Sequence, residues 1–275
     1  MLAPFCECKA ADAFFHFCRE SLNKFPEFLE NLISVSQIPV YFSNTGSLMP
    51  ASSFADNWEE RKEFFKAEDI PHEIWDEKLI KEKAPYLAKE CGEVIWVGEG
   101  QVNNRQLHDS LMTASKNLGV HIIEGNVTGF VRRESSVSAA ITNSGEIEGD
   151  QFVLASGSWS AQLAKELGVD LPLKPIKGQM CRLKLEDHIL DYTIHGMMTY
   201  IAPWKEGNGF VVGSTMEDRG FDSAIEEKVI DDLIERAGDI LPCLKEASLI
   251  ESWTGLRPAA KDLMPVMGRS GKYKN

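Results

Sequence analysis

The chain has 275 residues, 43% hydrophobic and 26% charged, so it can bury a normal core as one large domain or two interleaved ones. Its formal net charge of −13 argues against a nucleic-acid partner and against an anionic membrane surface, because both favour a basic face. No apolar run approaches the roughly 18 residues that a membrane span requires.

The first half of the chain alternates helical and extended patterns. Apolar residues at three- and four-residue steps predict a helix over 10–32, which Pro26 kinks or splits. The next pattern predicts a hairpin over 40–49. Two charged amphipathic helices are expected over 54–66 and 72–83.

The middle of the chain has the order expected of an α/β layer. A helix over 106–118 ends at Gly119, which is a common C-terminal signal. A glycine turn at Gly157 opens a further helix over 161–167. Strands are predicted over 93–97, 120–124, 126–132, 137–142, 146–148 and 151–155.

From Ile176 onward the pattern favours an antiparallel sheet with one long helix, over 224–237, on one face. Its strands are predicted over 177–184, 198–203, 209–215 and 246–253. The predicted fold class is therefore α/β plus α+β, in which a partial Rossmann-like domain is interleaved with an antiparallel-sheet domain.

The six cysteines are expected to be reduced thiols. The chain is long, and its first residues lack the basic stretch and apolar core of a signal peptide, so we expect a cytoplasmic protein. Cys6 and Cys8 could form half of a metal site. No second Cys or His pair at ligand spacing accompanies them, and the sequence predicts no metal site.

The stretch Trp253–Gly268, WTGLRPAAKDLMPVMG, places Arg257 at a predicted strand end beside Gly255 and Pro258. A guanidinium offers a planar fork of donors that matches a carboxylate. An ordinary surface or salt-bridged arginine is the alternative on this stretch alone.

This stretch resembles the W-x-G-L-R-P-x-x-x-D-x-x-P-x-x-G signature of glycine oxidases and D-amino acid oxidases, which are FAD-dependent amine-oxidising flavoproteins. Further stretches resemble the same family in order and spacing and favour the glycine oxidase branch associated with thiamine biosynthesis. They are Met1–Pro4, Gly100–Asn103, Gly119–Val127, Val153–Ser160, Lys177–Met180, Tyr200–Pro203 and Val211–Glu217.

The resemblance implies oxidation of glycine or a small D-amino acid to the imine, with FAD as cofactor and O₂ as acceptor. Arg257 and Tyr200 would hold the substrate carboxylate, and Met216 would line the pocket. No catalytic side-chain base is implied, because the cofactor carries the hard chemistry. An ordinary strand aromatic at Tyr200 and a core methionine at Met216 are the alternatives.

The resemblance also implies a set of cofactor-binding residues. Met1 and Leu2 would pass the flavin ring, and the backbone of Val127 would touch the adenine end. The stretch around Lys177 would lie next to the flavin ring, its position being better supported than any side-chain role. The implied FAD-binding residues are Met1, Leu2, Val127, Ser156, Gly157, Trp159 and Gln179.

The domain boundaries expected from the resemblance alternate along the chain. Residues 1–37, 99–172 and 253–275 would belong to the FAD-binding domain. Residues 38–98 and 173–252 would belong to the substrate domain. The expected partner is a small amino-acid substrate, and a homo-oligomer is compatible with the sequence.

Two departures from the family bear on function. The family's βαβ unit with G-x-G-x-x-G would precede Met1, and a glycine-rich closing segment would follow Asn275. The resemblance therefore implies a chain truncated at both ends that binds FAD poorly by itself. The alternatives are an FAD-dependent dehydrogenase with another electron acceptor, and an inactive fragment.

Overall fold

The computed structural model describes residues 1–186, 191–196, 198–205 and 209–275. They form two compact units, each assembled from separate segments of the chain. Among the described residues, no helix is both long and apolar enough to cross a lipid bilayer. Unit 1 comprises Met1–His121, Gln179–Thr215 and Ile225–Trp253, and unit 2 comprises Ile122–Gly178, Met216–Ala224 and Thr254–Asn275.

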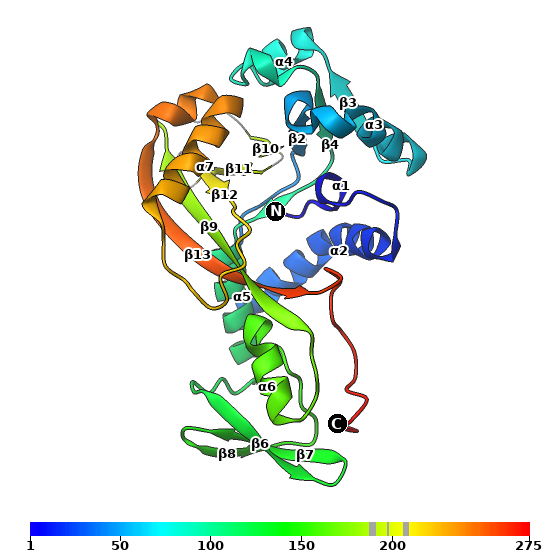
Figure 1. Ribbon diagram of the computed structural model, residues 1–275, viewed down its shortest axis with the longest axis vertical. Helices are drawn as coiled ribbons and strands as arrows, with labels where there is room; N and C mark the ends of the chain where they lie inside the picture. Colours follow the sequence, from blue (N-terminus) through cyan, green and yellow to red (C-terminus); the bar gives the residue numbers. More distant parts are fainter. Residues whose placement is uncertain (187–190, 197, 206–208) are drawn as a thin grey trace. The chain divides into compact units, whose positions relative to one another are not determined.

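An eight-stranded sheet, in the order β13-β9-β12-β11-β10-β2-β4-β3, supplies the strands of the unit 1 core (Figure 1). Strand β2 runs parallel to β10, whereas β4 is antiparallel to both β2 and β3. The sheet therefore contains both parallel and antiparallel pairs, whereas the sequence predicted an antiparallel sheet. The strands are β2 (Ser47–Pro50), β3 (His72–Trp75), β4 (Val94–Val97), β9 (Leu173–Lys184), β10 (Thr193–His195), β11 (Tyr200–Trp204), β12 (Gly209–Gly213) and β13 (Ser248–Ala260).

Adjacent residues of β2 enter two different apolar clusters. Leu48 packs with the cluster formed by β12 and α7 (Glu227–Ile240), and Met49 packs with the cluster that holds Phe15 and Phe65. Since successive strand side chains point to opposite faces, β2 is buried on both. The remaining unit 1 elements are α1 (Pro4–Glu7), α2 (Ala13–Ser36), β1 (Phe42–Ser43), η1 (Ala51–Asn57), α3 (Trp58–Ala67), α4 (Glu77–Lys83), η2 (Lys89–Cys91), β5 (Gln101–Val102), α5 (Asn104–Asn117) and η5 (Pro242–Glu246).

Unit 2 contains a three-stranded antiparallel sheet of β6 (Val127–Arg133), β7 (Ser136–Thr142) and β8 (Gly145–Glu148). η3 (Gly157–Trp159) leads into α6 (Ser160–Glu166). The last residues pack onto these elements: the Asn275 side chain bonds both the N–H and the carbonyl oxygen of Val137, at 2.9 and 2.8 Å.

In the first half, one predicted helix is confirmed with different bounds, and two other predictions were wrong in whole or in part. The helix over 10–32 is α2, which continues through Pro26 to Ser36, because its apolar side packs into the core through Leu29 and Leu32. Residues 40–49 form no hairpin: β1 pairs with β5, and β2 pairs with β4 and β10. The first turn of the helix predicted over 72–83 is strand β3, because its backbone pairs with β4.

Two predicted strands, over 120–124 and 151–155, are also wrong. Both stretches are apolar, but the structure places no partner strand beside them within the described residues. The N–H of Phe152 donates instead to the carbonyl oxygen of Asn275. Val153 is 89% exposed, so this stretch presents apolar side chains to its surroundings.

The short helix α1 is held by opposite charges at its two ends. One oxygen of the buried Glu99 carboxylate accepts hydrogen bonds from the N–H groups of Phe5 and Cys6. The buried Arg61 guanidinium donates to the carbonyl oxygens of Phe5, Cys6 and Cys8. A four-residue helix cannot satisfy its terminal backbone groups internally, so these two side chains replace the missing partners.

We expect Arg61→Met to lower the free energy of unfolding by about 2–3 kcal/mol, because it leaves buried carbonyl oxygens without a charged donor. Urea unfolding followed by tryptophan fluorescence measures the change. Arg236→Met, at an exposed position of α7, is the matched control and should change stability by about 0.5 kcal/mol or less. Equal stability of the two variants would show that Arg61 does not anchor α1.

Candidate functional site

Arg257 lies near the end of β13, and its guanidinium rests directly against Gly178 of β9. A Cβ atom added to Gly178 would lie 2.5 Å from Nη1 and 2.7 Å from Nη2 of Arg257. These separations are too short for non-bonded atoms. A side chain at position 178 would therefore displace the guanidinium, and glycine leaves room for it.

The residue before Gly178 anchors the neighbouring loop of unit 2. Lys177 is fully buried, and its Nζ lies 3.2 Å from Oδ2 of Asp222. Its backbone also exchanges two hydrogen bonds of 2.9 Å with Glu217. Hydrogen bonds from the Ala224 N–H and from Lys177 hold the pKa of Asp222 below its usual value. Residues 216–224 are thereby fixed beside the strand that carries Gly178.

The glycine turn at η3 packs against the same part of unit 2. Ser158 Oγ donates to the carbonyl oxygen of Leu256 at 2.9 Å, one residue before Arg257. The Trp159 ring lies 5.5 Å from the Phe221 ring, centroid to centroid. The Ser158 contact joins the η3 turn, which carries Gly157 and Trp159, to the residue that precedes Arg257.

This region presents apolar side chains that are exposed in the structure. Trp159 is 50% exposed and Met216 71% exposed. Gly157 has a φ of +55°, a conformation that glycine adopts without strain. Among the described residues, the N–H groups of Leu154 and Ala155 have no backbone partner.

Val127 begins β6 and pairs with Thr142 of β7. Its side chain is 37% exposed. Ser156 precedes that turn, and its hydroxyl is 3.1 Å from the hydroxyl of Ser160. The structure thus places Ser156 with the Gly157–Trp159 group, whereas a common site with Val127 stays a prediction.

Tyr200 and Gln179 belong to unit 1. The Tyr200 hydroxyl lies over Gly213, where an added Cβ would approach it to 2.9 Å. Gln179 is fully buried, and its Oε1 accepts a hydrogen bond of 2.8 Å from the N–H of Glu226. This side chain therefore binds the start of α7. Because Arg257 belongs to unit 2, the predicted Tyr200–Arg257 clamp stays a prediction.

Met1 and Leu2 also belong to unit 1, where Leu2 exchanges two backbone hydrogen bonds with Gly100, of 2.8 and 3.3 Å. Gly100 follows Glu99, whose carboxylate accepts the hydrogen bonds from α1. Burial raises the pKa of Glu99 to about 7 and lowers the pKa of the nearby His195 to about 3. The path of residues 1–8 is thus set by buried polar contacts.

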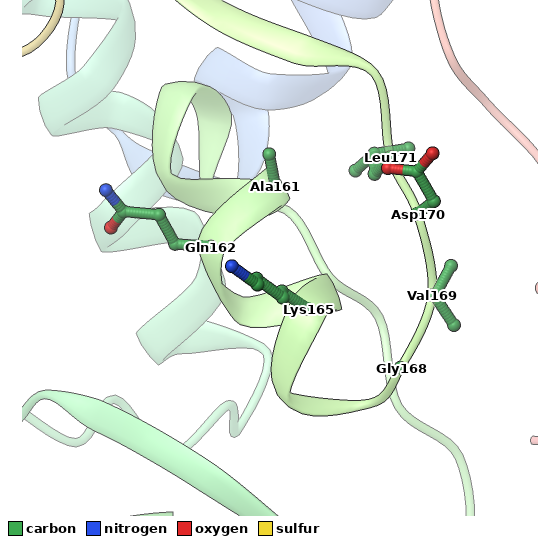
Figure 2. A pocket seen from close by; sticks show the side chains of 7 residues that line it. All are labelled: Ala161, Gln162, Lys165, Gly168, Val169, Asp170 and Leu171. Atoms are coloured by element: carbon green, nitrogen blue, oxygen red, sulfur yellow. The ribbon is translucent and has the colours of Figure 1, made fainter.

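A hollow of about 530 Å³ lies elsewhere in unit 2 (Figure 2). Three of its lining residues come from α6 and four from the loop that follows it (Figure 2). None of the predicted site residues lines it. Its lining residues are Ala161, Gln162, Lys165, Gly168, Val169, Asp170 and Leu171.

The sequence analysis did not predict a role for Phe221 or Asp222 at this site. Their partners, Lys177 and Trp159, lie far away in the chain, and no local pattern links them. The sequence does not single out Lys177, because β9 also contains Lys174, Arg182 and Lys184. Only the structure shows that Lys177 is the fully buried lysine, which needs an acidic partner.

Comparison with known proteins agrees with these motifs. The chain is 30% identical to the bifunctional protein ThiO/ThiG of Trichormus variabilis (strain ATCC 29413 / PCC 7937), over 100% of this chain and 43% of that protein. It therefore spans less than half the length of this relative. It is 28% identical to the glycine oxidase of Bacillus subtilis (strain 168), over 98% of this chain and 72% of that protein.

Solved structures share the fold. The glycine oxidase from Geobacillus kaustophilus matches with a TM-score of 0.92 at 23% identity, over 99% of this chain and 75% of that one. The glycine oxidase from Bacillus cereus ATCC 14579 matches with a TM-score of 0.90 at 25% identity, over 96% of this chain and 74% of that one. The expected fold class is confirmed.

The family described as "DAO: FAD dependent oxidoreductase" matches residues 1–275. The chain belongs to this family of FAD-dependent oxidoreductases.

Proposed function

We propose that this chain is the substrate-facing part of an FAD-dependent oxidase that converts glycine or another small amino acid to its imine, with O₂ as the electron acceptor. The observation that carries the proposal is the close contact of Arg257 with Gly178, within the GLRP stretch that the family resemblance assigns to carboxylate binding. Relatives named glycine oxidase and ThiO/ThiG support the substrate class and a place in thiamine biosynthesis.

Arg257 would bind the substrate carboxylate through two parallel hydrogen bonds. Such charge-assisted, bidentate pairs are stronger and more directional than neutral hydrogen bonds. Gly178 leaves room for the guanidinium in this position, and Tyr200 would add a hydroxyl donor. The exposed side chain of Met216 would form an apolar wall that favours small substrates.

The cofactor would be held by Met1, Leu2, Val127, Ser156, Gly157, Trp159 and Gln179. The exposed Trp159 ring and the open N–H groups that precede the η3 turn fit the face and polar edge of an isoalloxazine. Because the Gln179 side chain binds Glu226, we propose a backbone role for it. A bound flavin supplies the two-electron acceptor for the C–N oxidation.

The protein's own contribution is orientation. Two-point binding of the carboxylate fixes the α-carbon, and positioning of this kind can supply several kcal/mol of a reaction barrier. No side-chain base is proposed.

We also propose a cytoplasmic location, because all six cysteines are free thiols, as is usual in reducing compartments. The domain boundaries at 37/38, 98/99, 172/173 and 252/253 stay part of the proposal.

Turnover of glycine by the flavin-loaded protein should release H₂O₂ in a one-to-one ratio with the amine consumed. A peroxidase-coupled assay measures the product. Turnover that needs an added quinone and yields no H₂O₂ would contradict O₂ as acceptor and favour the dehydrogenase alternative.

Arg257→Ala should raise KM for glycine about tenfold to a thousandfold, the scale of a lost charge-assisted pair. Steady-state kinetics of the flavin-loaded protein measures it. Arg269→Ala, which removes an exposed arginine of the same unit, is the matched control and should leave KM unchanged. An unchanged KM in Arg257→Ala would remove this residue from the site.

A further inference from the structure

Three buried side chains of unit 1 bring different donor atoms together. Cys6 lies on α1, Glu99 follows β4, and His195 ends β10. A sulfur, a carboxylate oxygen and an imidazole nitrogen from these residues all lie within 4.8 Å of one another. The proposed oxidase function uses none of these side chains.

Two atoms of this group have no hydrogen-bond partner among the described residues. They are Oε2 of Glu99 and Nε2 of His195, whose residues are 1% and 5% exposed. Buried polar atoms are almost always paired, because an unpaired one costs free energy. Both α1 hydrogen bonds go to Oε1 of Glu99, so a ligand on the second oxygen would leave them intact. The side chains of Cys6 and Ser47 lie close to the same carboxylate.

The donor set suits a borderline-soft divalent ion. Zn²⁺ binds Cys sulfur at about 2.3 Å and His nitrogen or carboxylate oxygen at about 2.0–2.2 Å, which places tetrahedral donors about 3.5 Å apart. The donor atoms lie within 4.8 Å of one another, so they must approach by roughly 1 Å to reach this geometry. An ion with charge +2, a thiolate and a carboxylate sum to zero, so a buried complex leaves no net charge of its own.

The charges around the group fit this arrangement. Glu7 Oε1 lies 3.8 Å from Nδ1 of His195, where a carboxylate can orient a ligating imidazole. Arg61 supplies one positive charge nearby, and its hydrogen bonds go to backbone carbonyl oxygens rather than to the three donors. The N-terminal ammonium of Met1 is a second positive charge near His195, and Glu7 supplies a negative charge beside both.

We propose that Cys6, Glu99 and His195 form a buried site for a single divalent transition-metal ion of the Zn²⁺ or Co²⁺ class. The sequence predicted no metal site because no second Cys or His pair at ligand spacing accompanies Cys6 and Cys8, whereas the fold brings together α1, the end of β4 and the end of β10. The site binds α1 to the sheet, in addition to the Glu99 and Arg61 contacts.

Titration of the chelator-treated, reduced 275-residue chain with Co²⁺ tests the proposal. We expect a near-ultraviolet thiolate-to-cobalt charge-transfer absorption that saturates at one ion per chain, and its loss on addition of Zn²⁺. Glu7→Gln should weaken binding about 10–100-fold, as expected for an outer-shell partner. Absence of the absorption from the folded wild-type chain would overturn the proposal.

Matched variants assign the ligands. Cys6→Ser and His195→Ala should abolish the saturable signal. Glu99→Gln should weaken binding while its amide oxygen still accepts the α1 hydrogen bonds. Cys18→Ser and the exposed His108→Ala should bind as the wild type does. Circular dichroism confirms that each variant is folded. A signal that persists in Cys6→Ser, or that is lost in Cys18→Ser, would contradict the assignment.

Discussion

The contact between the Arg257 guanidinium and Gly178 is the constraint on which the unit 2 site depends. Arg257 lies in β13 and Gly178 in β9, so the guanidinium lies against a residue that has no side chain. Lys177, one residue earlier, is buried and ion-paired with Asp222. In β9, Gly178 therefore leaves room for the guanidinium, and the preceding residue, Lys177, anchors the loop that begins at Met216.

In unit 1, neighbouring residues likewise hold the start of the chain in place. Glu99 and Arg61 satisfy opposite ends of α1, and Gly100 pairs with Leu2. Met1 and Leu2, which the family resemblance assigns to the flavin ring, thus follow a path set by buried charges. Glu99 has a second oxygen that hydrogen bonding does not use, and this oxygen links the anchoring of α1 to the proposed metal site.

Elements with a strong local pattern could be predicted from the sequence. The helix that ends before Gly119 and the strand over 93–97 correspond to α5 and β4. The failures were segments whose state is decided by pairing: residues 72–75 have a helical pattern but pair with β4, and residues 151–155 have a strand pattern but lack a partner strand. Local propensity is a weak guide in such cases.

For the proposed site, a family resemblance in the sequence predicted Arg257 and the Gly157 turn. It could not identify the contacts of Gly178 with Arg257, Lys177 with Asp222, or Cys6 with Glu99 and His195. Each of these joins residues far apart in the chain. Only the fold determines which of them meet.

The most direct test of the proposed function is the KM for glycine of the flavin-loaded Gly178→Ala protein. The added methyl group would overlap the guanidinium, so Arg257 must move, and KM should rise about tenfold to a hundredfold. Gly271→Ala, whose added Cβ would meet nothing within 4 Å, is the matched control and should keep the wild-type KM. A wild-type KM in Gly178→Ala would contradict the assignment of Arg257 as the carboxylate-binding residue.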